Sequence, residues 1–187
     1  GQTVTWEGGE LTLPQISRVF QDPDRSRREH AWRLAAERQL ADRAAIHSLW
    51  AKFLALRQQI SGNASLDYRT YRWQQYLRFD YTPQDCRQFH DAIEQVVVPA
   101  ARRVYDRRRL RLGLEALRPW DLEVDPLNRP ALRPFKEVDE LKRKTAVLFR
   151  RVDPQLGDYF DRMVSEDLLD LDNRKNKAPG GYCTDFA

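Results

Sequence analysis

Apolar residues recur at spacings of three and four along most of this chain, which predicts amphipathic helices. The clearest case follows Asp22-Pro23-Asp24, a helix-start signal with acidic residues where the helix dipole favours them. No helix-breaking residue occurs from there to about residue 60, so we expect one continuous helix that ends at Ser61-Gly62-Asn63. Six apolar residues lie on a single face of this helix: Ile46, Leu49, Trp50, Phe53, Leu56 and Ile60.

Four further helices follow from the same pattern. We expect them over residues 66–79, 83–113, 137–152 and 154–166. Thr82-Pro83 gives the second of these an N-cap and a proline in its first turn. Pro99 lies inside it and predicts a kink, because proline removes a backbone hydrogen bond and clashes with the preceding turn. The predicted buried stripe of the helix over residues 83–113 consists of Phe89, Ile93, Val96, Val97, Ala100 and Val104.

The pattern changes at both ends of the chain and in one internal segment. Residues 3–13 read as two short strands around Gly8-Gly9, followed by a short helix over residues 14–20. Four prolines between residues 118 and 135 exclude a helix there. This segment either forms a rigid crossover that buries Trp120 or lines a cleft. The fold class is therefore mainly α: a long-helix scaffold with an N-terminal hairpin and a C-terminal strand after Gly180-Gly181.

Composition narrows the class of protein. Charged residues make up 32% of the chain and apolar residues 41%, a balance typical of long helices with one buried and one solvated face. The net charge of only +4 argues against a nucleic-acid partner, which favours concentrated positive charge. No apolar run is long enough to cross a membrane, and no signal-peptide pattern is present. Two distant cysteines fit a reduced, cytoplasmic setting, and we expect no membrane partner.

Few residues carry recognisable chemistry. His90 and Glu94 lie four apart on a predicted helix, but a zinc site needs three protein ligands and no H-E-x-x-H is present. We interpret the two as a solvated pair and expect no metal or catalytic residue in this chain. Cys86 falls in the first turn of a helix, where its pKa could be lowered, but a structural role is the simpler interpretation.

A run of arginines stands out between residues 102 and 111. Its members wrap around more than one helical face, so they either bind phosphate, or pair with carboxylates of adjacent helices or stay solvated. We favour pairing or solvation, and steeply salt-dependent binding to DNA or RNA would support phosphate binding. The run consists of Arg102, Arg103, Arg107, Arg108, Arg109 and Arg111.

The tail after Asn173 is the most suggestive segment. A basic, polar loop leads through Pro179 into Gly180-Gly181, which lets a backbone approach a ligand closely. A strand here could bind an extended peptide through main-chain hydrogen bonds. We therefore take Gly180, Gly181, Tyr182 and Cys183 as candidate substrate-binding residues.

Four segments, in matching order along the chain, carry a family resemblance. They are Asp67-Tyr68-Arg69, Phe79-Asp80-Tyr81-Thr82-Pro83, Arg118-Pro119-Trp120-Asp121-Leu122, and Asn173-Arg174-Lys175 through Gly180-Gly181-Tyr182-Cys183. Together they resemble the oligoendopeptidase F branch of the thimet-oligopeptidase-like zinc metallopeptidases.

That resemblance implies a mostly helical, two-lobed cytoplasmic peptidase that hydrolyses short peptides. Its catalytic helix would carry H-E-x-x-H, in which two histidines and a downstream glutamate hold Zn²⁺. In similar proteins a strand like Gly180–Cys183 borders the substrate cleft shortly before that helix. We expect this chain to be a fragment truncated at both ends, with zinc bound by the full-length parent and no activity of its own.

The expected organisation is one partial peptidase domain over residues 1–187. It comprises a hairpin and short helix at 1–20, long helices at 23–113, a proline-rich crossover at 114–136, and helices with the cleft-edge strand at 137–187. The alternative function is a stand-alone helical module that binds a peptide or a protein.

Overall fold

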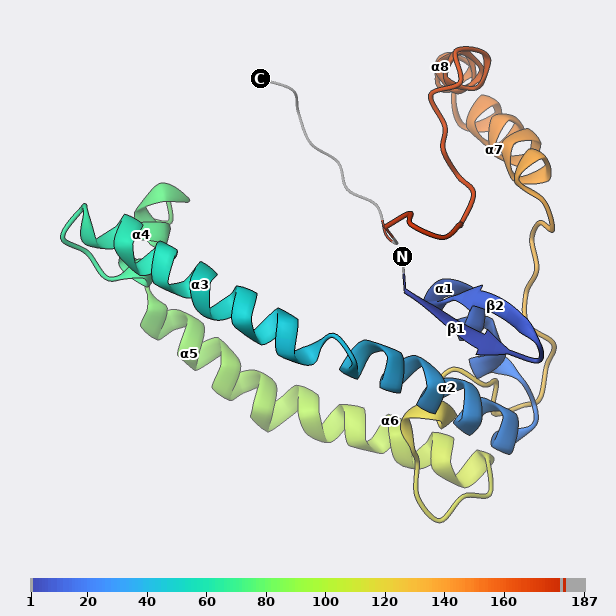
Figure 1. Ribbon diagram of the computed structural model, residues 1–187, viewed down its shortest axis with the longest axis horizontal. Coiled ribbons are helices and arrows are strands. Elements are labelled where there is room, and N and C mark those ends of the chain that lie inside the picture. The colour runs from blue at the N-terminus through green and yellow to red at the C-terminus, as the bar shows by residue number, and fades with distance from the viewer. Residues whose placement is uncertain (1, 179, 181–187) are drawn as a thin grey trace. The chain divides into compact units, whose positions relative to one another are not determined.

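The computed structural model describes residues 2–178 and 180. The chain divides into two compact units. The first combines Gly1–Ala35 with Glu123–Ala187, and the second is Ala36–Leu122. Helix α2 (Arg25–Leu40) begins in the first unit and ends in the second. The predicted fold class is confirmed: the described residues are mainly helical, with one two-stranded antiparallel sheet (Figure 1).

The sheet of the first unit is the predicted N-terminal hairpin. Strand β1 (Thr3–Trp6) pairs antiparallel with β2 (Gly9–Thr12), and Trp6 faces Gly9 across the ladder. The two-residue turn is Glu7-Gly8, with φ angles of 49° and 82°. Positive φ at both positions matches the right-handed twist of the two strands. The turn thus begins one residue earlier than the Gly8-Gly9 pair had indicated.

Two short helical turns continue the hairpin. Helix α1 (Leu13–Ile16) has Thr12 as its N-cap, and Gln15 completes a capping box by bonding back to the Thr12 N–H at 2.8 Å. The 3-10 turn η1 (Ser17–Gln21) follows. Ile16 is fully buried with Val4 and Ala31, which joins the hairpin to α2 in one small core. Trp6, Leu11, Leu13, Val19, Phe20, Leu34 and Ala35 pack around this core.

The entry into α2 depends on a buried arginine. Arg28 is only 3% exposed, and its Nη1 donates to the main-chain oxygens of Asp22 and Pro23 at 2.8 and 2.9 Å. Its guanidinium satisfies carbonyl groups that lie outside the helix ladder. Arg28 therefore fixes the direction in which the chain enters the helix.

The same unit contains a helical hairpin of α7 (Val138–Val152) and α8 (Pro154–Ser165), close to the predicted ranges. Asp153 alone joins the two helices, and its carboxylate caps α8 by accepting from the Gln155 N–H at 2.7 Å. Gly157 lets the helices approach closely, because a Cβ added there would lie 2.9 Å from the Cβ of Arg150.

The prediction of a single long helix over residues 23–60 is wrong. Two helices, α2 and α3 (Arg43–Gly62), meet at a turn formed by Ala41 and Asp42. The Asp42 N–H bonds to the Gln39 oxygen, three residues back, so the helix tightens and stops. Aspartate favours such a position over a helix interior, and Arg38 holds the carboxylate of Asp42 at 3.0 Å.

Helix α4 (Tyr68–Gln75) is shorter than the predicted 66–79, and Leu77 follows it with a φ of 54°. The predicted helix over 83–113 is divided into α5 (Pro83–Ala92), the π-turn η2 (Ile93–Val97) and α6 (Val98–Arg111). The wide turn lies where Pro99 leaves the carbonyl of residue 95 without its usual donor. The π-turn thus lies directly before Pro99, the residue at which the sequence predicts a kink.

The predicted buried stripe of this helix is also wrong. Ile93 and Ala100 are only half-buried, and Phe89, Val96, Val97 and Val104 are between 53% and 67% exposed. The spacing correctly identified a helical face, but none of the described elements covers it. Periodicity reports that a face is apolar and not which surface meets it.

The 3-10 turn η3 (Pro119–Asp121) ends this unit and buries Trp120, as the rigid-crossover interpretation predicted. Asp121 is fully buried and accepts from the Arg118 N–H at 2.9 Å. Arg108 Nε donates to the main-chain oxygen of Asp121 at 2.8 Å.

Candidate functional site

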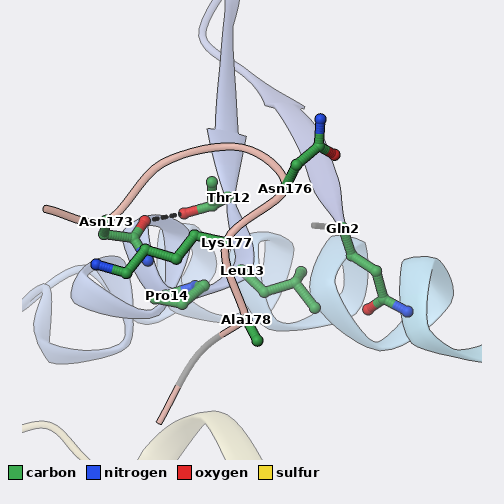
Figure 2. Close-up of a pocket in the computed structure, with 8 residues that line it drawn as sticks. All are labelled: Gln2, Thr12, Leu13, Pro14, Asn173, Asn176, Lys177 and Ala178. Atoms are coloured by element: carbon green, nitrogen blue, oxygen red, sulfur yellow. Dashed lines mark hydrogen bonds between the residues drawn. The ribbon is translucent and has the colours of Figure 1, made fainter. Parts of the chain in front are cut away.

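The loop of residues 170–178 packs against the N-terminal hairpin within the first unit. The hydroxyl of Thr12 donates to Oδ1 of Asn173 at 2.5 Å, and Figure 2 shows the two side chains pointing toward each other. Lys175 Nζ pairs with Glu10 Oε1 at 2.8 Å. Both hairpin partners belong to β2, and Thr12 is only 6% exposed. The loop is therefore anchored to an ordered element of the fold.

A second set of contacts holds the loop to itself. Asp170 accepts two hydrogen bonds from Arg174, at 2.6 and 2.8 Å, and Lys177 Nζ lies 3.1 Å from the same carboxylate. Lys177 also donates to the main-chain oxygens of Asp170 and Asp172 at 2.6 and 2.7 Å. We call Asp170, Arg174 and Lys177 the carboxylate clamp.

The charges of these groups follow from the geometry. Hydrogen bonds from Arg174, then from Lys177, hold the pKa of Asp170 far below its usual range. The pKa of Arg174 is raised in turn, mainly by its hydrogen bond to Asp170. The pKa of Glu10 is lowered first by the hydrogen bond from Lys175 and then by that from Thr3. The lowered pKa values of Asp170 and Glu10 and the raised pKa of Arg174 each favour the charged form of the group.

Between the loop and the hairpin lies a cavity of about 460 Å³. Three carboxamide side chains and an apolar floor line it, a combination suited to a peptide, whose main chain both donates and accepts hydrogen bonds. We call this the amide cavity. Its lining residues are Gln2, Thr12, Leu13, Pro14, Asn173, Asn176, Lys177 and Ala178 (Figure 2).

The substrate-binding residues expected from the sequence follow the cavity-lining residue Ala178 along the chain. Gly180 lies two residues after Ala178, is exposed, and has a φ of 97°, a conformation that L side chains rarely adopt. Gly181, Tyr182 and Cys183 lie outside the described residues, as does the C-terminal strand predicted for them. The structure therefore describes the approach to the predicted site and one of its four residues.

The sequence pattern missed the cavity itself. Gln2 and Thr12 carried no signal of binding, because most of the chain separates them from Asn173 in sequence. A weak local signal did exist at Asn176, since asparagine tolerates the left-handed backbone it adopts here, with a φ of 67°.

The other sequence candidates are not brought together. His30, His47 and His90 belong to α2, α3 and α5. Within residues 2–178 and 180, no group of three or more His, Cys, Asp or Glu side chains could hold a metal ion. Cys86 is a half-buried free thiol in the first turn of α5.

Two arginines of the predicted run make local contacts, which favours the pairing interpretation for those two. Arg108 binds the main-chain oxygen of Asp121 at 2.8 Å, and Arg109 binds that of Leu114 at 3.2 Å. Arg109 also lies 3.6 Å from Asp106. Their main partners are carbonyl groups of the following loop, where carboxylates of adjacent helices had been expected.

The sequence of residues 19–187 matches the model of one protein family, Peptidase family M3. The chain belongs to peptidase family M3. The match includes the whole second unit and the first unit from residue 19 on, and so includes α3, the proline-rich segment and the loop of residues 170–178. No curated protein matches the sequence.

Solved structures share the fold of this M3 chain. A candidate oligoendopeptidase F from Bacillus anthracis str. Ames has a TM-score of 0.85 at 22% identity, over 98% of this chain and 34% of that one. A second candidate oligoendopeptidase F has a TM-score of 0.86 at 24% identity, over 98% of this chain and 32% of that one. PZ peptidase A, solved with an inhibitor, has a TM-score of 0.85 at 24% identity, over 97% of this chain and 32% of that one.

The M3 chain thus spans about a third of the length of these solved structures. No helix among its described residues is both long enough and apolar enough to cross a bilayer.

Proposed function

We propose that this chain is the scaffold and part of the substrate cleft of a zinc-dependent metalloendopeptidase of the oligoendopeptidase F type. The complete enzyme hydrolyses short peptides in the cytoplasm. This chain supplies no catalytic group and cleaves nothing by itself. The observation that carries the proposal is the match to peptidase family M3 over residues 19–187.

The metal must be considered separately, because zinc needs about three protein ligands in a catalytic site. The described residues of this chain do not fit that requirement, since no three His, Cys, Asp or Glu side chains among them lie close enough together to hold a metal ion. The proposal therefore assigns the zinc ligands, and the activation of water that zinc supplies when bound, to other residues of the complete peptidase. What this chain contributes is the positioning of substrate.

We assign that contribution to the amide cavity and the segment after it. The carboxamides of Asn173 and Asn176 both donate and accept hydrogen bonds, so they match the main chain of a peptide without selecting its side chains. Leu13 and Pro14 supply apolar contact below them. Gly180 to Cys183 then extends the same contact as a cleft-edge strand.

The proposal also assigns the domain organisation. Residues 1–187 form a partial peptidase domain in which residues 114–136 serve as the crossover between helices. The rigid turn at Trp120 supports this assignment, because its buried side chains fix the direction of the chain.

The test is hydrolysis of short, internally quenched peptides by two proteins: the 187-residue chain and the full-length gene product that contains it. We expect the full-length protein to cleave, a chelator to abolish cleavage, and added Zn²⁺ to restore it. The 187-residue chain should give no signal with or without zinc.

Three results would contradict the proposal. Chelator-insensitive cleavage by the full-length protein would exclude a metallopeptidase. Zinc-dependent cleavage by the 187-residue chain would show that it holds a metal site of its own. Specific peptide binding by an inactive full-length protein would favour the stand-alone binding module.

A further inference from the structure

Helix α3 presents a broad apolar surface that nothing described in the chain covers. Its large apolar side chains span roughly 160° of the helix at about 100° per residue, and they are between 42% and 66% exposed. We call this surface the α3 apolar arc. It consists of Ile46, Leu49, Trp50, Phe53, Leu54, Leu56 and Ile60.

Such a surface is out of place on a solvated helix. Most helical stability in proteins comes from packing of an apolar face against the rest of the molecule. Contiguous apolar patches on this scale mark interfaces. The face opposite the arc carries small side chains, including Ser48 and Ala55, so the two faces differ in chemistry.

The charges around the arc indicate what it meets. Arg43, Lys52 and Arg57 belong to α3, and the helix contains no acidic residue. Arg57 is stacked over the ring of Phe53 at 3.6 Å from its centroid, so its cation lies directly on the arc. A complementary surface would be apolar at its centre and acidic at its edges.

A second copy of this chain does not meet that description. Two α3 helices packed through the arc would bring cations against cations, with no carboxylate on either helix. The second unit as a whole has the same bias, with 15 Arg and Lys against 10 Asp and Glu in residues 36–122. Like charges facing each other oppose association.

The comparison with solved structures supplies another source of partner surface. Chains of the same fold are about three times as long as this one, and this chain covers 32–34% of each. We propose that the α3 apolar arc docks an apolar, acid-edged surface formed by the rest of an M3 peptidase polypeptide. This inference rests on the proposed function, in which the chain is one part of a larger enzyme.

Cysteine protection tests the docking. In a background with Cys86→Ala and Cys183→Ser, Leu49→Cys and Phe53→Cys place thiols on the arc. Ser48→Cys and Ala55→Cys place matched thiols on the opposite face of the same helix. The labelling rate of each thiol with a maleimide is measured in the full-length gene product and in the 187-residue chain.

We expect the two arc thiols to label at least about tenfold more slowly than the control thiols in the full-length protein, because a docked face reacts only after opening. In the 187-residue chain all four should label at similar rates. Lys52→Glu, added to Leu49→Cys, should restore fast labelling in the full-length protein, whereas Ser48→Glu should not.

Equal rates for arc and control thiols in the full-length protein would overturn the inference. Arc protection within the 187-residue chain would also overturn it: protection that rises with concentration would identify a second copy, and constant protection a segment of the same chain. Peptidase activity of the full-length protein with its natural Cys183, a candidate substrate-binding residue, separates the two proposals. An active full-length protein with an unprotected arc would contradict this inference alone. An inactive full-length protein with a protected arc would contradict the proposed function alone.

Discussion

Thr12 and Asn173 are joined by a hydrogen bond of 2.5 Å although 161 residues separate them in sequence. The same hydroxyl accepts from the Gln15 N–H and so caps α1. One side chain therefore couples the start of a helix to the loop that lines the amide cavity. Changes at Thr12 should affect both.

Thr12→Val should lower the free energy of unfolding by about 1–2 kcal/mol, because it removes an N-cap and leaves Asn173 without its buried partner. Thr12→Ser keeps the hydroxyl and should remain within about 0.5 kcal/mol of the natural protein. Urea denaturation measures both. If Asn173→Ala abolishes most of the difference between Val and Ser, the coupling is confirmed. Full additivity of the two changes would refute it.

Gly157→Ala should lower the free energy of unfolding by about 1–3 kcal/mol, because the new Cβ would overlap the Cβ and Cα of Arg150. Gly62→Ala is the matched control, since that helical glycine has no atom within 4 Å of the added Cβ. It should be neutral or stabilising by up to about 1 kcal/mol. Thermal unfolding of both variants decides the matter, and equal melting temperatures would exclude the close contact between α7 and α8.

The carboxylate clamp predicts a specific dependence on pH. The pKa of Asp170 is lowered in the folded protein relative to about 3.9 in an unfolded chain. Its contribution is therefore complete above the unfolded value and is lost as pH falls through the folded value. The stability difference between the natural protein and Asp170→Asn should stay constant from neutral pH to about 5 and shrink below about 4. A difference that grows on acidification would contradict this linkage.

Asn176→Gly tests the amide cavity in the full-length enzyme. Glycine accepts the positive φ of this position, so the change removes the carboxamide and spares the backbone. We expect KM for short peptides to rise about fivefold with kcat unchanged, since a lost hydrogen bond is worth about 1 kcal/mol. Asn128→Gly is the control, because Asn128 also has a positive φ, 53°, and does not line the cavity. Equal effects of the two variants would remove the cavity from the substrate site.

Local secondary structure could be predicted from the sequence wherever the interacting groups lie within a few residues of each other. The hairpin, the capped start of α5 at Thr82-Pro83 and the boundaries of α7 and α8 are all of this kind. The break at Asp42 was missed because no proline or glycine marks it. The helix ends there in a turn of Ala41 and Asp42, closed by the bond from the Asp42 N–H to the Gln39 oxygen.

Burial was harder to predict than secondary structure. The spacing of Phe89, Val96 and Val104 identifies a helical face, yet all three are more than half exposed. Which surface an apolar face meets depends on residues far away in sequence. The amide cavity was missed for the same reason, because Gln2 and Asn176 meet only once the chain has folded.

The π-turn before Pro99 has a consequence for any attempt to engineer this chain. Such a turn amounts to one extra residue in an α-helix. Deleting a single residue from Ile93–Val97 would restore regular α-helical phase. The side chains of α6, including Arg108 and Arg109, would then keep nearly the same direction relative to α5, because the π-turn had absorbed the extra residue. Closing the turn to regular α-helix without a deletion would instead rotate them by about 100°. In this segment the pairing of backbone hydrogen bonds, more than the identity of any side chain, determines which way the arginines point.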